Sequence, residues 1–208
     1  MAWISGNRYL SQSEMENNAL EFRAAVFSRL PTATVNGVAA ILGNMQTEST
    51  INPGIWENLS PFDPAYGGYG LVQWTPWTKY SDWAGAGWED NGAKEVERIV
   101  QYEAIDYPNT QWFYNVDAPT IGLPIDPPLT LLQLLESSND PAILAKYFLA
   151  YYEHPGSLTA SHEARSAQAR AWYDFLNGQP YHSDARTLLL LRRPQDDMGH
   201  YRRYTRGI

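Results

Sequence analysis

The chain has 208 residues, of which 44% are hydrophobic, so it can bury one sizeable core and form one or two domains. It contains no cysteine, which excludes disulfide bonds, thiolate metal sites and a cysteine nucleophile. The formal net charge of −8 argues against nucleic acid as the main partner, because phosphate groups bind to positive surfaces. No stretch reaches the roughly 18 consecutive apolar residues of a membrane span, so we expect none.

The first residues lack the basic start and apolar run of a secretion signal, so we expect no such signal. A helix is expected where Ser11 and Ser13 each precede a glutamate by three residues, the spacing of a capping box. Apolar residues then recur at spacings of four, three and four, which predicts an amphipathic helix with a buried face made of Met15, Ala19, Phe22 and Val26.

A second helix is expected to begin after Thr34, whose side chain can cap its first turn. It should end near Glu48, because the Asn-Pro-Gly run at 52–54 cannot continue a helix. Its apolar face is expected to consist of Val35, Val38, Ala39, Leu42 and Met45.

A loop rich in proline, glycine, asparagine and aspartate follows over residues 49–68. Residues 69–74 (YGLVQW) predict either a short strand or a buried turn of helix, because periodicity does not separate the two in so short a run. Helices are predicted over 77–84 and about 93–106, and a connection with four prolines over 115–128.

Helical patterning returns over residues 129–135. The Asp-Pro pair at 140–141 supplies a cap and a proline at the first helical position, and the helix that it opens should stop at Pro155. Ser161 is expected to open a last helix, which the Asn-Gly pair at 177–178 closes.

The sequence therefore predicts one mainly α domain over residues 1–178 and a separate basic tail over 179–208. The end of the chain, 186–208, carries six arginines against two aspartates, unlike the acidic remainder. Such a tail either attaches the domain to an acidic partner, for example within a virus particle, or is solvated and disordered.

Glu48 is the candidate catalytic residue. At helical spacing it shares a face with Ile41 and Met45, so it should emerge where the apolar core meets the loop. Partial desolvation and the negative end of the helix dipole both favour a protonated carboxyl there. A protonated acid is what a glycosidase needs in order to protonate the leaving oxygen. The alternative is a solvated glutamate at a helix end.

Three segments carry a resemblance to a known family: 43–56 (GNMQTESTINPGIW), 68–75 (GYGLVQWT) and 151–155 (YYEHP). Together they resemble the phage tail lysozyme family, which consists of wall-degrading domains in tail proteins of phages that infect Gram-positive bacteria. The resemblance runs from about residue 3 to 178. It implies a mainly α, lysozyme-like α+β domain with a small β or loop region beside the cleft.

By position, the resemblance assigns the catalytic glutamate to Glu48, with Ser49 after it as expected, and a place in the sugar cleft to Gln73. Asp63 is the candidate second carboxylate and Glu57 is its rival. The alternative for Asp63 is a turn-forming residue before a proline.

The second carboxylate bears on the mechanism. A carboxyl separation of about 5–5.5 Å implies a covalent retaining route, and about 6.5–9.5 Å leaves room for an inverting water. Without a usable second carboxylate, a group of the substrate itself would complete the reaction, as in lytic transglycosylases. Hydrolysis is the favoured interpretation.

Three aromatic residues in or beside the motifs, Trp56, Tyr69 and Trp74, can either stack on sugars or pack in the core. Glu153 is expected to hydrogen-bond near the cleft without a catalytic role. The four histidines show no metal-ligand spacing, so we expect no metal and no cofactor.

These patterns favour a peptidoglycan glycosidase of the muramidase type, carried on a phage tail to breach the host cell wall. Its expected partners are peptidoglycan glycan strands and other tail proteins, with no nucleic acid and no membrane span. The alternatives are a lytic transglycosylase of the same fold, an endolysin released from the cell, and an inactive tail subunit that has a structural or wall-binding role.

Overall fold

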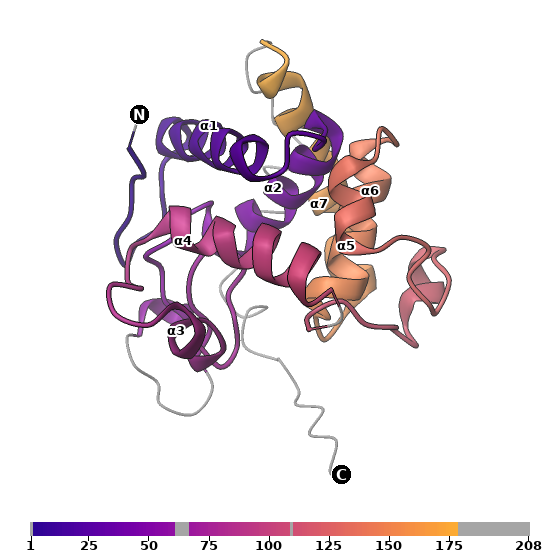
Figure 1. The fold of residues 1–208 in the computed structure, drawn as a ribbon. Helices are drawn as coiled ribbons and strands as arrows, with labels where there is room; N and C mark the ends of the chain where they lie inside the picture. Colours follow the sequence, from indigo (N-terminus) through magenta and orange to yellow (C-terminus); the bar gives the residue numbers. More distant parts are fainter. Residues whose placement is uncertain (1, 61–66, 109, 179–208) are drawn as a thin grey trace.

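The computed structural model describes residues 2–60, 67–108 and 110–178 (Figure 1). The chain is mainly α, as the sequence predicts. In chain order the helices are α1 (Gln12–Arg29), α2 (Val35–Ser49), α3 (Thr78–Ala84), α4 (Gly92–Glu97), α5 (Leu131–Glu136), α6 (Pro141–Phe148) and α7 (Leu158–Leu176). Short 3₁₀ turns form η1 (Glu57–Leu59) and η3 (Ala118–Ile121), and π-helical segments form η2 (Arg98–Asp106) and η4 (Leu149–Glu153). The basic tail expected over 179–208 lies outside the described residues.

Helix α2 lies at the centre of the fold, between α1, α6 and α7 (Figure 1). Nearly every residue from Gly37 to Ser49 is buried. The predicted bounds are confirmed, because Thr34 caps the helix through a hydrogen bond from the Gly37 N–H and Thr50 ends it in a left-handed conformation with φ of 53°. A buried central helix fixes the position of the carboxyl group at its C-terminal end.

Helices α2 and α7 approach each other closely at Gly43. A Cβ atom at this position would lie 2.7 Å from the backbone oxygen of Arg165 and 2.7 Å from the backbone nitrogen of Ala169. Only glycine fits this crossing without moving α7. The contact places the first half of α7, including Arg165, beside the C-terminal half of α2, where Glu48 lies.

The other helix boundaries follow local signals. At the start of α1, the Glu14 carboxylate accepts a hydrogen bond from the Ser11 N–H, which confirms the capping box. Asp140 caps α6 at the Ala142 N–H. The predicted start of the last helix at Ser161 is wrong, because α7 begins at Leu158 after an extended Ser157. The last helix therefore starts almost directly after the turn at 154–156, three residues earlier than the serine at 161 that was expected to open it.

The small β region expected beside the cleft is not built from strands in the described part of the chain. It consists of two isolated bridges, which pair Tyr69 with Trp56 and with Trp74. The segment 69–74 is a tight turn, in which Gly70 has φ of 80° and Tyr69 and Trp74 exchange backbone hydrogen bonds. The buried Glu95 carboxylate accepts a hydrogen bond from the Leu71 N–H at 2.6 Å and so stabilises this turn.

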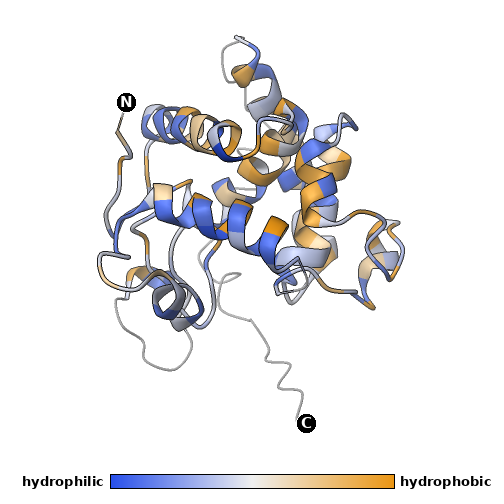
Figure 2. Ribbon diagram, viewed as in Figure 1, coloured by the Kyte–Doolittle hydropathy of each residue, from blue (hydrophilic) through white to orange (hydrophobic). Residues whose placement is uncertain are grey.

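The helices are amphipathic and turn their apolar sides inward (Figure 2). The face predicted for α1 is confirmed, because Met15, Ala19, Phe22 and Val26 are all buried. Within the described ranges, no helix combines the length and the apolar character that crossing a membrane requires.

Candidate active site

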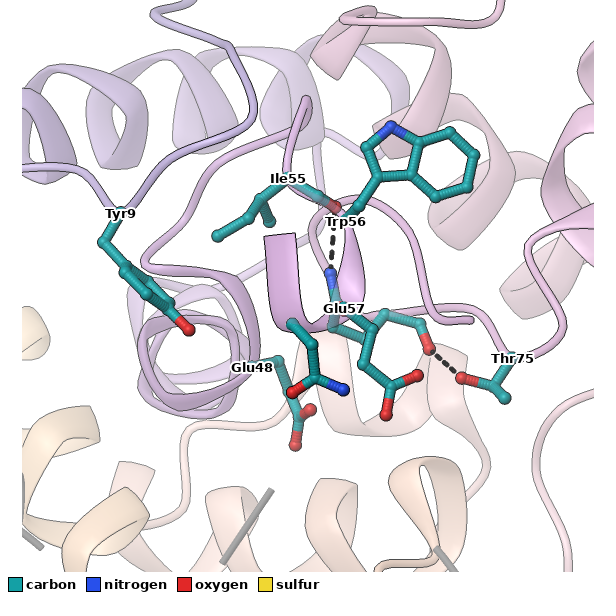
Figure 3. Close-up of a pocket in the computed structure, with 8 residues that line it drawn as sticks. Tyr9, Glu48, Ile55, Trp56, Glu57 and Thr75 are labelled. Carbon is teal, nitrogen blue, oxygen red and sulfur yellow. Dashed lines mark hydrogen bonds between the residues drawn. The ribbon is translucent and has the colours of Figure 1, made fainter. Parts of the chain in front are cut away.

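Glu48 lies in the last turn of α2 with 8% of its surface exposed. Its side chain opens onto a pocket where the two sequence motifs meet (Figure 3). The lining residues are Tyr9, Glu48, Ile55, Trp56, Glu57, Asn58, Gln73 and Thr75. The carboxyl group is thus both largely desolvated and accessible from the pocket.

Ser49 ties the two motifs together directly. Its hydroxyl lies within hydrogen-bonding distance of two carbonyl oxygens, 3.0 Å from that of Met45 on the preceding helical turn and 2.8 Å from that of Leu71 in the second motif. A hydroxyl at this position therefore couples the end of α2 to the turn at 69–74.

Gln73 has a left-handed backbone with φ of 50° and faces the same pocket as Glu48. Its side-chain amide donates to the Gly70 carbonyl at 2.9 Å and to the Ile55 carbonyl at 3.2 Å. The hydroxyl of Thr75 donates to the Gln73 carbonyl at 2.9 Å. These bonds hold the turn rigidly beside Glu48.

Glu57 also lines the pocket, and its carboxylate accepts the Gly68 N–H at 2.8 Å. Figure 3 shows the carboxyl groups of Glu48 and Glu57 extending toward the same edge of the view, from α2 and η1. Asp63, the other candidate for a second carboxylate, lies outside the described residues.

Arg165 forms a buried ion pair with Glu48 that the sequence analysis missed. Its Nη2 lies 2.5 Å from Glu48 Oε1, and the two side chains are 5% and 7% exposed. A guanidinium at this distance forms a charge-assisted hydrogen bond with the carboxyl group of Glu48. Helical spacing places Arg165 on one face of α7 with Ala169 and Trp172, which indicates that it is buried, but this pattern does not identify Glu48 as its partner.

Glu153, the last residue of η4, belongs to the same group of charges. Its Oε1 is buried and accepts no hydrogen bond from the described part of the chain. Burial raises the pKa of this carboxyl well above its usual range, the negative charge of Glu48 raises it further, and Arg165 acts in the opposite direction. Glu153 is thus a buried carboxyl group on which the charges of Glu48 and Arg165 act.

The sequence profile of phage tail lysozymes matches residues 17–176, which is most of the chain. The chain belongs to the phage tail lysozyme family. The family is lysozyme-like, and its substrate class is peptidoglycan.

Morphogenesis protein 1 of Bacillus phage B103 is similar to this family member, with 37% identity over 179 residues. The aligned region covers 85% of this chain and 44% of the relative. The chain thus spans less than half of the length of that phage protein.

In this member of the phage tail lysozyme family, the three aromatic candidates for sugar stacking lie in different environments. Trp56 lines the pocket, although only 6% of its surface is exposed. Tyr69 and Trp74 are 1% and 3% exposed and do not line it. Their polar atoms are used inside the fold, because the Tyr69 hydroxyl accepts the Asp90 N–H and Trp74 Nε1 donates to Glu103. Tyr69 and Trp74 are therefore core residues, which is the second of the two roles that the sequence left open for them.

No group of three histidine, aspartate or glutamate side chains in the described ranges of this lysozyme family member is placed to hold a metal ion. His154, which follows Glu153, faces the Tyr151 carbonyl at 3.1 Å, and burial lowers the pKa of its imidazole.

Proposed function

We propose that the chain is a muramidase-type glycosidase that cleaves peptidoglycan glycan strands, and that a phage tail carries it to the host cell wall during infection. The observation that supports this most is the pocket, in which the buried Glu48 faces Gln73 and Glu57. Family membership supplies the substrate class, and the phage relative supports a place in the virion.

In this proposal Glu48 is the general acid. It gives its proton to the glycosidic oxygen as the bond to the sugar breaks, and its desolvated position strengthens that interaction. Gln73 faces the sugar and orients it, because hydrogen bonds hold both its side-chain amide and its backbone carbonyl in place. Trp56 offers the apolar wall of the pocket.

The second carboxylate stabilises the positive charge that develops on the sugar ring. We propose Glu57 for this role on its position in the pocket, and Asp63 remains the competing candidate from the sequence. Loss of the second carboxylate should slow cleavage by about 10²-fold or more, because ring charge is then unopposed in the transition state. We therefore expect this loss in Glu57→Gln, with little change in Asp63→Asn, when both are assayed on purified cell walls at equal protein concentration. The reverse order would transfer the role to Asp63.

Mass spectrometry of the muropeptides released from purified Gram-positive peptidoglycan tests bond and mechanism together. We expect fragments with reducing ends at N-acetylmuramic acid, because a water molecule completes hydrolysis. Fragments with 1,6-anhydro ends would show that the sugar's own 6-hydroxyl completes the reaction, and the enzyme would be a lytic transglycosylase. A digest without any released muropeptide would indicate an inactive structural subunit, a role that the name of the phage relative allows for that protein.

A further inference from the structure

Tyr9 precedes α1 and lies outside the residues 17–176 that match the family profile. Even so, its side chain lines the same pocket as Glu48. Tyr9 is 39% exposed, against 6% for Trp56 and 2% for Ile55, the two other hydrophobic residues of the lining. Of these three side chains, Tyr9 is therefore the one that a ligand in the pocket reaches most easily.

The backbone on both sides of Tyr9 is fastened to the chain that directly follows α2. Asn52 Nδ2 donates to the Arg8 carbonyl at 2.6 Å, and the Leu10 N–H donates to the Thr50 hydroxyl at 2.9 Å. Asn52 is fully buried and Leu10 is 6% exposed, so both are part of the folded interior. Tyr9 thus sits between two fixed points close to the end of the helix that carries the proposed acid.

Asn7 attaches the same N-terminal segment to another part of the pocket lining. Its Oδ1 accepts the Trp56 N–H at 3.1 Å, and its Nδ2 donates to the Leu59 carbonyl at 2.9 Å. The segment 7–10 is therefore bonded to the chain at 50–52 and at 56–59. These bonds hold Tyr9 in place before any ligand arrives.

Figure 3 shows the Tyr9 side chain across the pocket from Glu57 and Thr75, with Glu48 between them in the view. A sugar ring has apolar C–H faces and a polar rim, and an aromatic ring packs well on such a face while a phenolic hydroxyl stays in contact with water. Because the backbone of Tyr9 is already ordered, little conformational entropy is lost when the ring makes this contact. A tyrosine on a loose chain end would lack this advantage.

We infer that Tyr9 is a sugar-binding residue, which forms the wall of the pocket across from Glu57 and packs its ring on an amino sugar of the bound glycan strand. The inference rests on the proposed function, because that function names the glycan as the ligand. It gives the N-terminal segment, which the family profile does not include, a role in substrate affinity.

The first test measures binding without cleavage. Isothermal titration calorimetry is carried out in the Glu48→Gln background, with peptide-free glycan strands from Gram-positive cell walls as the probe. Adding Tyr9→Ala is expected to raise Kd about tenfold, because the aromatic contact is lost. Adding Tyr9→Phe should keep Kd within about twofold, because the ring remains.

Tyr114→Ala is the matched control in the same background. Tyr114 is 43% exposed, close to the value for Tyr9, but it does not line the pocket, so its loss should leave Kd unchanged. An unchanged Kd in Tyr9→Ala, or a loss in Tyr9→Phe as large as that in Tyr9→Ala, would overturn the ring contact. Absence of glycan binding by the background protein would overturn it as well.

The second test separates binding from chemistry in the protein with Glu48 intact. Tyr9→Ala should raise KM for the glycan strands by about tenfold and change kcat by less than about threefold, because the contact is made before and during the reaction alike. A lower kcat at an unchanged KM would contradict the inference.

The inference and the proposed function fail separately. Binding that depends on Tyr9, in a protein that releases no muropeptides, would remove the glycosidase and leave the sugar contact. Muropeptide release with unchanged Kd and KM in Tyr9→Ala would leave the glycosidase and remove the sugar contact.

Discussion

Glu48→Gln is expected to reduce muropeptide release from Gram-positive cell walls by at least about 10²-fold, because a positioned general acid contributes that much or more. The amide cannot donate the proton that the leaving oxygen needs. It keeps an oxygen that can accept a hydrogen bond from Arg165, so the variant should stay folded. Turbidity clearing and reducing-end assays measure the rate, and circular dichroism checks the fold.

Glu163→Gln serves as the control for this variant, since it makes the same chemical change on an exposed glutamate. Its activity should equal that of the wild type. A folded Glu48→Gln protein that clears walls at the wild-type rate would remove Glu48 from the mechanism.

Arg165→Met is expected to lower the free energy of unfolding by about 3–5 kcal/mol, which is the usual cost of breaking a buried ion pair from one side. Methionine fills much of the same space but leaves the Glu48 carboxylate buried without its cation. The hydrogen bonds from Arg165 to Asn44 Oδ1 and to the Asn44 carbonyl are lost as well. Urea denaturation of the variant and the wild type measures this difference in the free energy of unfolding.

Arg170→Met is the matched control on the same helix. Arg170 pairs with Asp140, but the two side chains are 63% and 39% exposed, so its loss should cost less than about 1 kcal/mol. The double variant Arg165→Met with Glu48→Gln should recover part of the stability lost in Arg165→Met, because it removes the unpaired charge. Equal losses in Arg165→Met and Arg170→Met would contradict the importance of the buried pair.

Local signals in the sequence were sufficient for most helix boundaries. Thr34, Ser11 and Asp140 cap the helices that they were expected to cap, because capping depends on a few neighbouring residues. Ser161 failed as a start signal, since Ser157 precedes it by four residues and comes directly after the turn that ends η4. Residues 69–74 form a tight turn, and neither the strand nor the turn of helix that the sequence left open. The buried Glu95 carboxyl group, which accepts the Leu71 N–H, is 24 residues away, and no local pattern indicates this contact.

The sequence predicted only those residues of the site that belong to recognisable motifs. Glu48 and Gln73 belong to motifs, and the fold brings both to one pocket. Arg165 was missed because it is 117 residues away from Glu48, and no local pattern indicates a pairing at that separation. The aromatic residues show the same limit. Neighbouring sequence does not distinguish a tryptophan in the pocket, such as Trp56, from one in the core, such as Trp74, and burial depends on the whole fold.

The pairing of α2 with α7 has a consequence for the order of events during synthesis. The ribosome makes α2 early, but the guanidinium that completes its carboxyl cluster comes on the final helix of the described domain. A growing chain that ends before α7 has neither the Glu48–Arg165 pair nor the neighbour against which Gly43 packs. The buried surroundings of the Glu48 carboxyl group are therefore complete only once α7 has been translated.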